Sequence, residues 1–197
     1  MANGRRVSFA SATLRPMRTH FIAVLTFVAL ATSSVALAQA PSVERVRTML
    51  STYEQGPSQI QWRALGSETV ATLQRIYDDH DQPGFMRMRA VAAAAHFPGD
   101  ATRTFLHRVA EERGQSDLFV RTAIRAMHRA FGNAAADDIR PYLDHQERVV
   151  REAAVMAYST MRLPQVRASL EQRLQVETDD HIRYEIQNAL SSMREVH

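Results

Sequence analysis

The chain has 197 residues, 45% of them hydrophobic, with 24 basic side chains against 21 acidic ones and no cysteine. This length suits one domain of ordinary size, and the balanced composition argues against a chain that is disordered throughout. Because the sequence has no cysteine, it excludes a disulfide framework, a thiolate zinc site, an iron–sulfur cluster and a cysteine nucleophile. Every basic side chain is an arginine, and the sequence contains no lysine.

The first 38 residues have the pattern of an export signal. Four arginines and no acidic residue precede the uncharged segment from Phe21 to Ala38. A basic segment followed by an apolar segment and small residues is what a secretory signal peptide requires. Ala36 and Ala38 give the small-x-small pattern, so cleavage is predicted between Ala38 and Gln39 and the protein is predicted to be periplasmic or secreted. An uncleaved membrane anchor is the alternative, since the apolar segment is just long enough to span a bilayer.

Removal of this segment changes the charge balance. All 21 acidic residues follow residue 38, whereas four of the 24 arginines precede it, which leaves 20 basic against 21 acidic side chains and a net charge of −1. A nearly neutral mature chain gives no electrostatic reason to expect a nucleic-acid or anionic-membrane partner. A protein without thiols also suits a compartment in which thiols oxidise.

A dipeptide of an apolar residue and arginine repeats along the rest of the chain, with arginine spacings of 32, 30 and 32. In each copy, the positions four and seven residues after the apolar residue are also apolar or small, which is the spacing of one face of an α-helix. The repeat therefore predicts four equivalent helices with the same buried face. The predicted buried positions are Met88, Ala92 and Ala95; Val120, Ile124, Met127 and Phe131; Val150, Ala154, Ala157 and Met161; and Ile182, Ile186, Ala189 and Met193.

Second apolar-periodic segments are predicted at residues 69–77, 101–112, 134–143 and 166–176. Turn residues separate the elements: Asp100, after Pro98-Gly99, is predicted to cap the following helix, and Gly132-Asn133 and Pro164 mark later boundaries. Pro141 falls inside its segment and predicts a kink or a late helix start. A diverged first copy begins at Val46-Arg47, with an insertion at residues 56–62.

These elements predict an all-α fold of about nine helices in four to five antiparallel pairs. Each pair exposes an apolar stripe that it cannot cover alone, so the pairs are expected to stack as an α-α superhelix, or α-solenoid. The predicted domains are a signal peptide at 1–38, an N-terminal capping helix with its insertion at 39–66, and a repeat domain at 67–197. Trp62, in the insertion, is predicted to cover the open end of the stack or, equally, to anchor an interface.

The repeats resemble HEAT repeats, and the closest likeness is to the short HEAT-like units found in phycobilisome lyases. The resemblance covers residues 67–193 and rests on the stretches MRAVAAAAHF (88–97), VRTAIRAM (120–127), VREAAVMAY (150–158) and IRYEIQNAL (182–190). It implies a rigid scaffold for binding another protein. A lyase or isomerase that acts on a protein-bound ligand is the alternative that the same resemblance implies.

The four repeated arginines, Arg89, Arg121, Arg151 and Arg183, have two interpretations. They could line a groove for an anionic ligand, or they could form a structural ladder that pairs with carboxylates or helix C-terminal carbonyls of the adjoining copy. Their constant position beside the apolar stripe, and the acidic residues just upstream of three of them, favour the ladder.

No catalytic, cofactor or metal site is predicted. Asp78-Asp79-His80-Asp81 has metal-ligating residue types, but consecutive side chains at a helix end point in different directions, so a solvated loop is expected. Asp179-Asp180-His181 is explained by N-capping. The histidines are scattered, and neither a His-Glu dipeptide of the HEAT-like hydroxylases nor an H-E-x-x-H, G-x-S-x-G or phosphate-loop motif occurs in the sequence.

The outward positions of the second helices form the candidate partner-binding surface, which would line the concave side of a HEAT-like array. The row mixes both charges with an excess of arginine, which suits an electrostatically steered protein contact better than an apolar ligand pocket. Its residues are Arg75, Arg103, His107, Arg108, Glu111, Arg167, Glu171 and Arg173. We therefore expect an exported, non-catalytic scaffold that binds another protein in the cell envelope, without nucleic acid and without a membrane contact after signal cleavage.

Overall fold

Paired amphipathic helices make up the fold. A computed structural model describes residues 40–52 and 56–193, and within these ranges the chain is helical and contains no strand. The predicted all-α class is therefore confirmed. The predicted signal peptide and its cleavage site lie outside the described residues.

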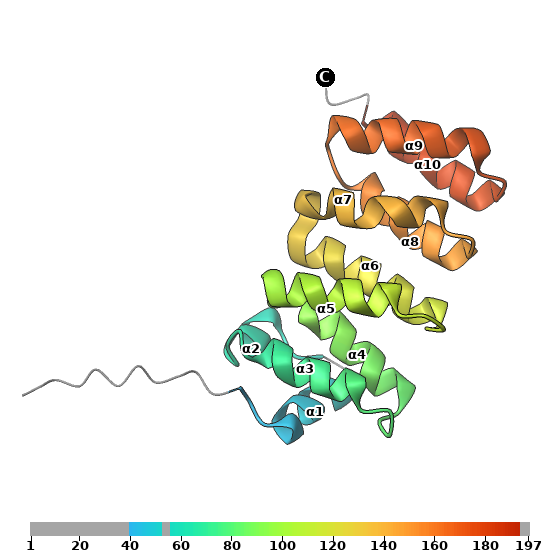
Figure 1. The fold of residues 1–197 in the computed structure, drawn as a ribbon. Helices are drawn as coiled ribbons and strands as arrows, with labels where there is room; N and C mark the ends of the chain where they lie inside the picture. The colour runs from blue at the N-terminus through green and yellow to red at the C-terminus, as the bar shows by residue number, and fades with distance from the viewer. Residues whose placement is uncertain (1–39, 53–55, 194–197) are drawn as a thin grey trace, which may run out of the picture. The chain divides into compact units, whose positions relative to one another are not determined.

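The helices fall into two rows that alternate along the chain (Figure 1). The helices that carry the repeated dipeptide, here called the Arg helices, are α4 (Gly84–Ala94), α6 (Asp117–Phe131), α8 (Arg148–Ser159) and α10 (Asp180–Ser192). The second helices are α3 (Thr69–Asp78), α5 (Asp100–Glu111), α7 (Ala136–Ile139) between the 3₁₀ segments η1 (Gly132–Ala135) and η2 (Arg140–Asp144), and α9 (Pro164–Val176). Two further helices, α1 (Val43–Ser51) and α2 (Gln59–Arg63), precede them.

The helix pairs stack as an α-solenoid. Of the two second helices beside it, each Arg helix packs more extensively against the one that precedes it, so the pairs are α3/α4, α5/α6, η2/α8 and α9/α10. Successive Arg helices pack on one another, α4 on α6, α6 on α8 and α8 on α10, and α1 packs on α3 and α4. The structural repeat therefore begins with the second helix, whereas the sequence motif placed the Arg helix first.

Local signals explain several helix ends. The side chains of Ser42, Ser116 and Asp179 accept hydrogen bonds from backbone N–H groups at the starts of α1, α6 and α10. Gly132 ends α6 with φ of 54°, a conformation that glycine adopts without a steric penalty. The prediction for Asp100 was wrong: it is the first residue of α5, Gly99 is the N-cap, and no side chain caps this helix.

Two segments differ from their predicted form. The predicted insertion contains the short helix α2, which begins with a capping box: the Gln61 N–H donates to Ser58 Oγ at 3.3 Å, and the Ser58 N–H donates to Gln61 Oε1 at 2.7 Å. The second helix expected at 134–143 is divided into η1, α7 and η2. The predicted disruption by Pro141 is confirmed, because proline has no N–H to continue the ladder of α7.

The predicted buried face is confirmed in α8, in α10 and, apart from the partly buried Phe131, in α6, but in α4 only Ala95 of the three predicted residues is buried. Met88 and Ala92 are only half-buried, whereas Met86, Ala90, Ala93 and Phe97 are buried. The true copy in α4 is therefore FMR at 85–87, which corresponds to FVR at 119–121. Two apolar-arginine dipeptides lie side by side here, and the alanines that follow fit either register, so periodicity alone does not choose between them.

Ile124 lies at the centre of the stack, in α6, and is fully buried. Ile124→Asp is expected to unfold the protein, because it forfeits about 1.5–3 kcal/mol of apolar burial and also buries a charge, against a total stability of about 5–15 kcal/mol. Circular dichroism should show the loss of helical signal. Leu118→Asp, on the same helix at a side chain that is 44% exposed, is the matched control and should stay folded. A folded Ile124→Asp protein would refute this packing.

Candidate partner-binding surface

The structure places the predicted surface residues on three second helices: Arg75 on α3, Arg103, His107, Arg108 and Glu111 on α5, and Arg167, Glu171 and Arg173 on α9. The α5 residues line a hollow of about 880 Å³ together with Asp78 and Glu112. Polar contacts of these residues join each second helix to the next one along the chain.

An ion pair joins α3 to α5. The Arg108 guanidinium donates to both carboxylate oxygens of Asp78, at 2.6 and 3.2 Å, and it lies 5.5 Å from the ring centroids of Tyr77 and Phe105. The hydrogen bond to Asp78 raises the pKa of Arg108. About half of each charged side chain is exposed, so this pair contributes little stability but fixes the position of the guanidinium.

Asp138 joins α5 to α7. Its carboxylate accepts a hydrogen bond from Arg103 and lies 3.0 Å from Nε2 of His107. The Arg103 guanidinium also lies over the ring of Phe131, 4.4 Å from the centroid, and Glu111 lies 3.4 Å from Nδ1 of His107. Two of the predicted residues, Arg103 and His107, thus meet at a carboxylate that the sequence did not single out, and Glu111 contacts the opposite nitrogen of His107.

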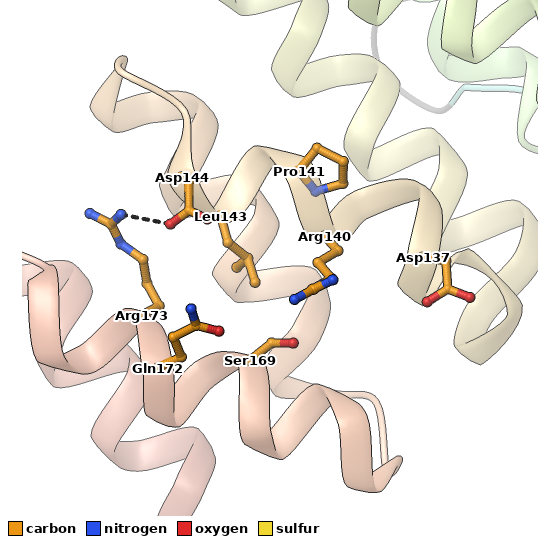
Figure 2. A pocket seen from close by; sticks show the side chains of 8 residues that line it. All are labelled: Asp137, Arg140, Pro141, Leu143, Asp144, Ser169, Gln172 and Arg173. Atoms are coloured by element: carbon orange, nitrogen blue, oxygen red, sulfur yellow. Dashed lines mark hydrogen bonds and ion pairs between the residues drawn. The ribbon is translucent and has the colours of Figure 1, made fainter.

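Arg173 joins η2 to α9. Its guanidinium donates to Asp144 at 3.0 Å, and both side chains line a hollow of about 490 Å³ together with Arg140 and Gln172 (Figure 2). Arg167 pairs with Glu171 at 2.9 Å within α9. Most of the predicted surface residues are therefore engaged in ion pairs, and the Arg75 side chain is the exposed cation of this set that makes none among the described residues.

The repeated arginines do not all behave alike. Arg89 donates to a backbone carbonyl of α1, Leu50 O at 2.6 Å, and Arg183 donates to one of the preceding helix α9, Leu174 O at 3.1 Å. Arg151 donates to Glu177 in the next copy. Arg121 departs from the ladder interpretation, because its Nε is buried with no hydrogen-bond partner among the described residues. In α4, where the register is shifted, Arg87 also donates to a carbonyl of the preceding helix, Tyr77 O at 2.6 Å.

Glu177, between α9 and α10, is the polar centre of the last junction, and its side chain has no exposed area. Its carboxylate accepts hydrogen bonds from Arg151 of α8 at 3.0 and 3.1 Å, from Arg173 of α9 at 2.9 and 3.1 Å, and from the backbone N–H groups of Thr178 and Asp179 at 3.0 Å. Glu177 was not among the residues predicted from the sequence. One feature of the sequence could have identified it. Glu177 lies six residues before the repeated arginine of its copy, and the same position holds Gln115 and His145 in the two preceding copies, neither of which is negatively charged.

The surroundings of Glu177 favour its charged form. Burial alone would raise the pKa of this carboxyl, but the hydrogen bonds from Arg151, the Asp179 backbone N–H and Arg173 outweigh burial and lower the pKa to about 2. Such a buried, fully hydrogen-bonded carboxylate is a structural group. It is not placed to exchange protons near neutral pH.

The acidic clusters form local contacts. Asp78 pairs with Arg108, and Asp79 accepts hydrogen bonds from the Gln82 side chain at 2.6 Å and the Asp81 N–H at 3.1 Å. Asp179 caps α10 and also accepts from Arg148 at 2.7 Å. Within residues 40–52 and 56–193, no group of three or more histidine or acidic side chains is arranged to hold a metal ion.

Trp62, in α2, packs against the C-terminal end of α4. Its ring stacks on His96 with centroids 5.8 Å apart and meets Phe97 edge-on at 6.3 Å, and the side chain is buried. Burial lowers the pKa of His96, and the nearby charges of Arg129 and Arg63 lower it further. Trp62 is therefore a buried packing residue beside the turn that follows α4.

The alternating helix pairs define a helical-repeat protein. The comparison with protein families identifies the repeat: residues 112–191, from the end of α5 to the last turn of α10, match the model of HEAT repeats. Residues 112–191 are thus HEAT repeats, as the sequence motifs implied. The comparison with curated proteins found no match. None of the described helices is both long and apolar enough to cross a membrane.

Arg151 and Arg121 occupy equivalent positions but have opposite surroundings. Arg151→Met is expected to lower the free energy of unfolding by about 2 kcal/mol or more, because Glu177 loses two charged hydrogen bonds while buried. Arg121→Met should be neutral or slightly stabilising, since it removes an unpartnered buried Nε. Urea denaturation of the two variants gives the comparison, and equal losses of stability would contradict it.

The lowered pKa of Glu177 makes stability depend on pH in one direction. Relative to an ordinary value of 4.5, a folded pKa of about 2 gives a contribution of about 3 kcal/mol that is complete above pH 4.5 and lost as the pH falls to 2. The stability difference between wild type and Glu177→Gln should therefore shrink over this window in denaturation experiments. Glu171→Gln, at an exposed surface pair, is the control and should change stability by less than about 1 kcal/mol throughout.

Proposed function

We propose that this protein is an exported, non-catalytic scaffold that binds another protein in the cell envelope. The observation that carries the proposal is the uninterrupted stack of HEAT-type helix pairs, since an array of this kind offers a long, rigid surface and often mediates protein interactions. The ion pairs from Asp78 to Arg108, Asp138 to Arg103 and Asp144 to Arg173 support the same proposal, because they hold the second helices in fixed relation.

Export is supported by the amino-acid sequence alone. The basic segment, the uncharged segment at 21–38 and the small residues at 36 and 38 are the three parts of a secretory signal. A periplasmic or secreted location would place the arginine-rich surface where it meets other envelope or extracellular proteins. The proposed contact is polar, because the second-helix row carries both charges.

Site-specific photocrosslinking in the native cells tests both parts of the proposal. The chain contains no lysine, so amine-reactive reagents would modify only its N-terminus, and a photoreactive amino acid in place of exposed Arg75 is the better probe. We expect a discrete protein adduct from this position and none from the same probe at exposed Ile60. N-terminal sequencing of the same sample should begin at Gln39. A cytoplasmic protein with an intact N-terminus would contradict export, and no adduct from exposed positions on either row would contradict protein binding.

A further inference from the structure

A hollow of about 470 Å³ lies between the Arg helices α4 and α6, on the row opposite to the predicted surface. Its α4 side includes Phe85, Met88 and Ala92, which lie three and four residues apart and so share one helix face. Its α6 side includes Arg125 and Arg129, which share a face for the same reason. Arg89 also lines the α4 side, but the other α4 residues make that wall mainly apolar, whereas the two α6 arginines make the other wall cationic.

The apolar wall is a consequence of the shifted register in α4. Met88 and Ala92 are only half-buried, and Phe85 is 47% exposed. The equivalent Phe119 in α6 is 7% exposed, because Arg87 and Tyr77 pack against its ring. The helix α4 thus exposes an apolar side chain at a position where the equivalent side chain of α6 is covered by its neighbours.

The cationic wall has no internal counter-charge. Arg125 and Arg129 are exposed, and neither guanidinium makes a hydrogen bond or ion pair with another described residue. None of the side chains that line the hollow is a carboxylate. Together α4 and α6 carry five arginines and a single acidic residue, Asp117, in a mature chain that is close to neutral overall.

The repeat itself shows that these two arginines are not required by the fold. With Arg121, Arg151 and Arg183 aligned, Arg125 corresponds to Val155 in α8 and Gln187 in α10. In the same alignment Arg129 corresponds to Ser159 and Ser191. A structural ladder would repeat the guanidiniums, whereas these occur only beside the uncovered apolar wall.

We propose that this hollow binds an acidic segment of the partner protein, with an aliphatic or aromatic side chain against Phe85, Met88 and Ala92 and flanking carboxylates on Arg125 and Arg129. Guanidinium groups bind carboxylates through two parallel hydrogen bonds, which gives both orientation and strength. This inference rests on the proposed function, and it names the chemistry of the partner.

A peptide suits the hollow better than a nucleic acid does. The Arg89 guanidinium lies over the Phe85 ring, 5.7 Å from its centroid, so that face of the ring is not available for stacking on a base. The mature net charge of −1 also gives no general attraction for a phosphate backbone. The electrostatic attraction for a negatively charged partner is confined to the hollow.

Fluorescence anisotropy with labelled synthetic peptides tests the proposal on the full chain purified from its native cells. The probe is an acidic peptide of glutamate and serine with one central leucine. We expect it to bind at least about tenfold more tightly than the same peptide with glutamine for glutamate, and more tightly than the version with alanine for leucine, with affinity that falls as salt is added. Equal binding of the three peptides would overturn the proposal.

Charge-reversal variants locate the site. Arg125→Glu/Arg129→Glu should weaken binding of the acidic peptide at least about tenfold, and Arg125→Lys/Arg129→Lys should retain part of it. Arg45→Glu/Arg113→Glu makes the same charge change at two other exposed arginines and should bind within about twofold of wild type. Loss of affinity in both reversal variants would show a non-specific charge effect and refute the site. Circular dichroism confirms that each variant is folded.

Two further outcomes separate this inference from the alternatives. Labelled single-stranded DNA that binds more tightly than the acidic peptide, and loses affinity with Arg125→Glu/Arg129→Glu, would replace the peptide with a nucleic acid and overturn the proposal. A protein adduct from the photoreactive residue at position 75, without any peptide binding at the hollow, would leave the proposed function standing and refute this inference alone.

Discussion

The burial of apolar side chains between successive Arg helices is the interaction on which this structure depends. Val120, Ile124 and Met127 of α6 have their counterparts in α8 and α10, and each such side chain contributes about 1.5–3 kcal/mol when it is removed from water. No helix pair can achieve this burial alone. Cooperativity between neighbouring copies, more than the strength of any copy, therefore holds the array together.

Polar contacts add direction to a packing force that has none. Burial alone would tolerate small slides of one helix pair over the next, because apolar contacts are not directional. An ion pair between a carboxylate and particular guanidiniums tolerates such slides less well, because its hydrogen bonds are directional. Glu177, held by Arg151 and Arg173 from two different helices, is the strongest example, since its side chain is removed from solvent. The exposed pairs along α3, α5 and η2 contribute less energy and serve mainly to fix side-chain positions.

The sequence predicted the class and most elements because both depend on local patterns. Helical periodicity, the turn at Gly132 and the disruption at Pro141 are encoded within a few residues, and the structure confirms them. The register of α4 was wrong because Met86-Arg87 and Met88-Arg89 satisfy the same pattern. The helix α2 was not predicted, although Ser58 and Gln61 have the spacing of a capping box.

The contacts of the surface residues were beyond sequence reasoning for a different reason. Arg151 and Glu177 are separated by 26 residues in the sequence. Partners so far apart meet only once two copies have stacked. Arg103 and His107 were recognised as outward residues, but their convergence on Asp138 depends on how α5 faces α7. The spacing of residues along one helix predicts the direction of a side chain, but it does not predict which residue of another helix that side chain contacts.

The exclusive use of arginine has a consequence for the conditions that the array tolerates. A guanidinium keeps its proton well beyond the range in which a lysine amine becomes neutral, so the cationic half of each arginine–carboxylate pair described above survives in strongly alkaline solution. The carboxylate partners are also ionised there. Loss of these contacts by titration is therefore confined to acid, and a compartment that turns basic would leave the junctions between copies intact.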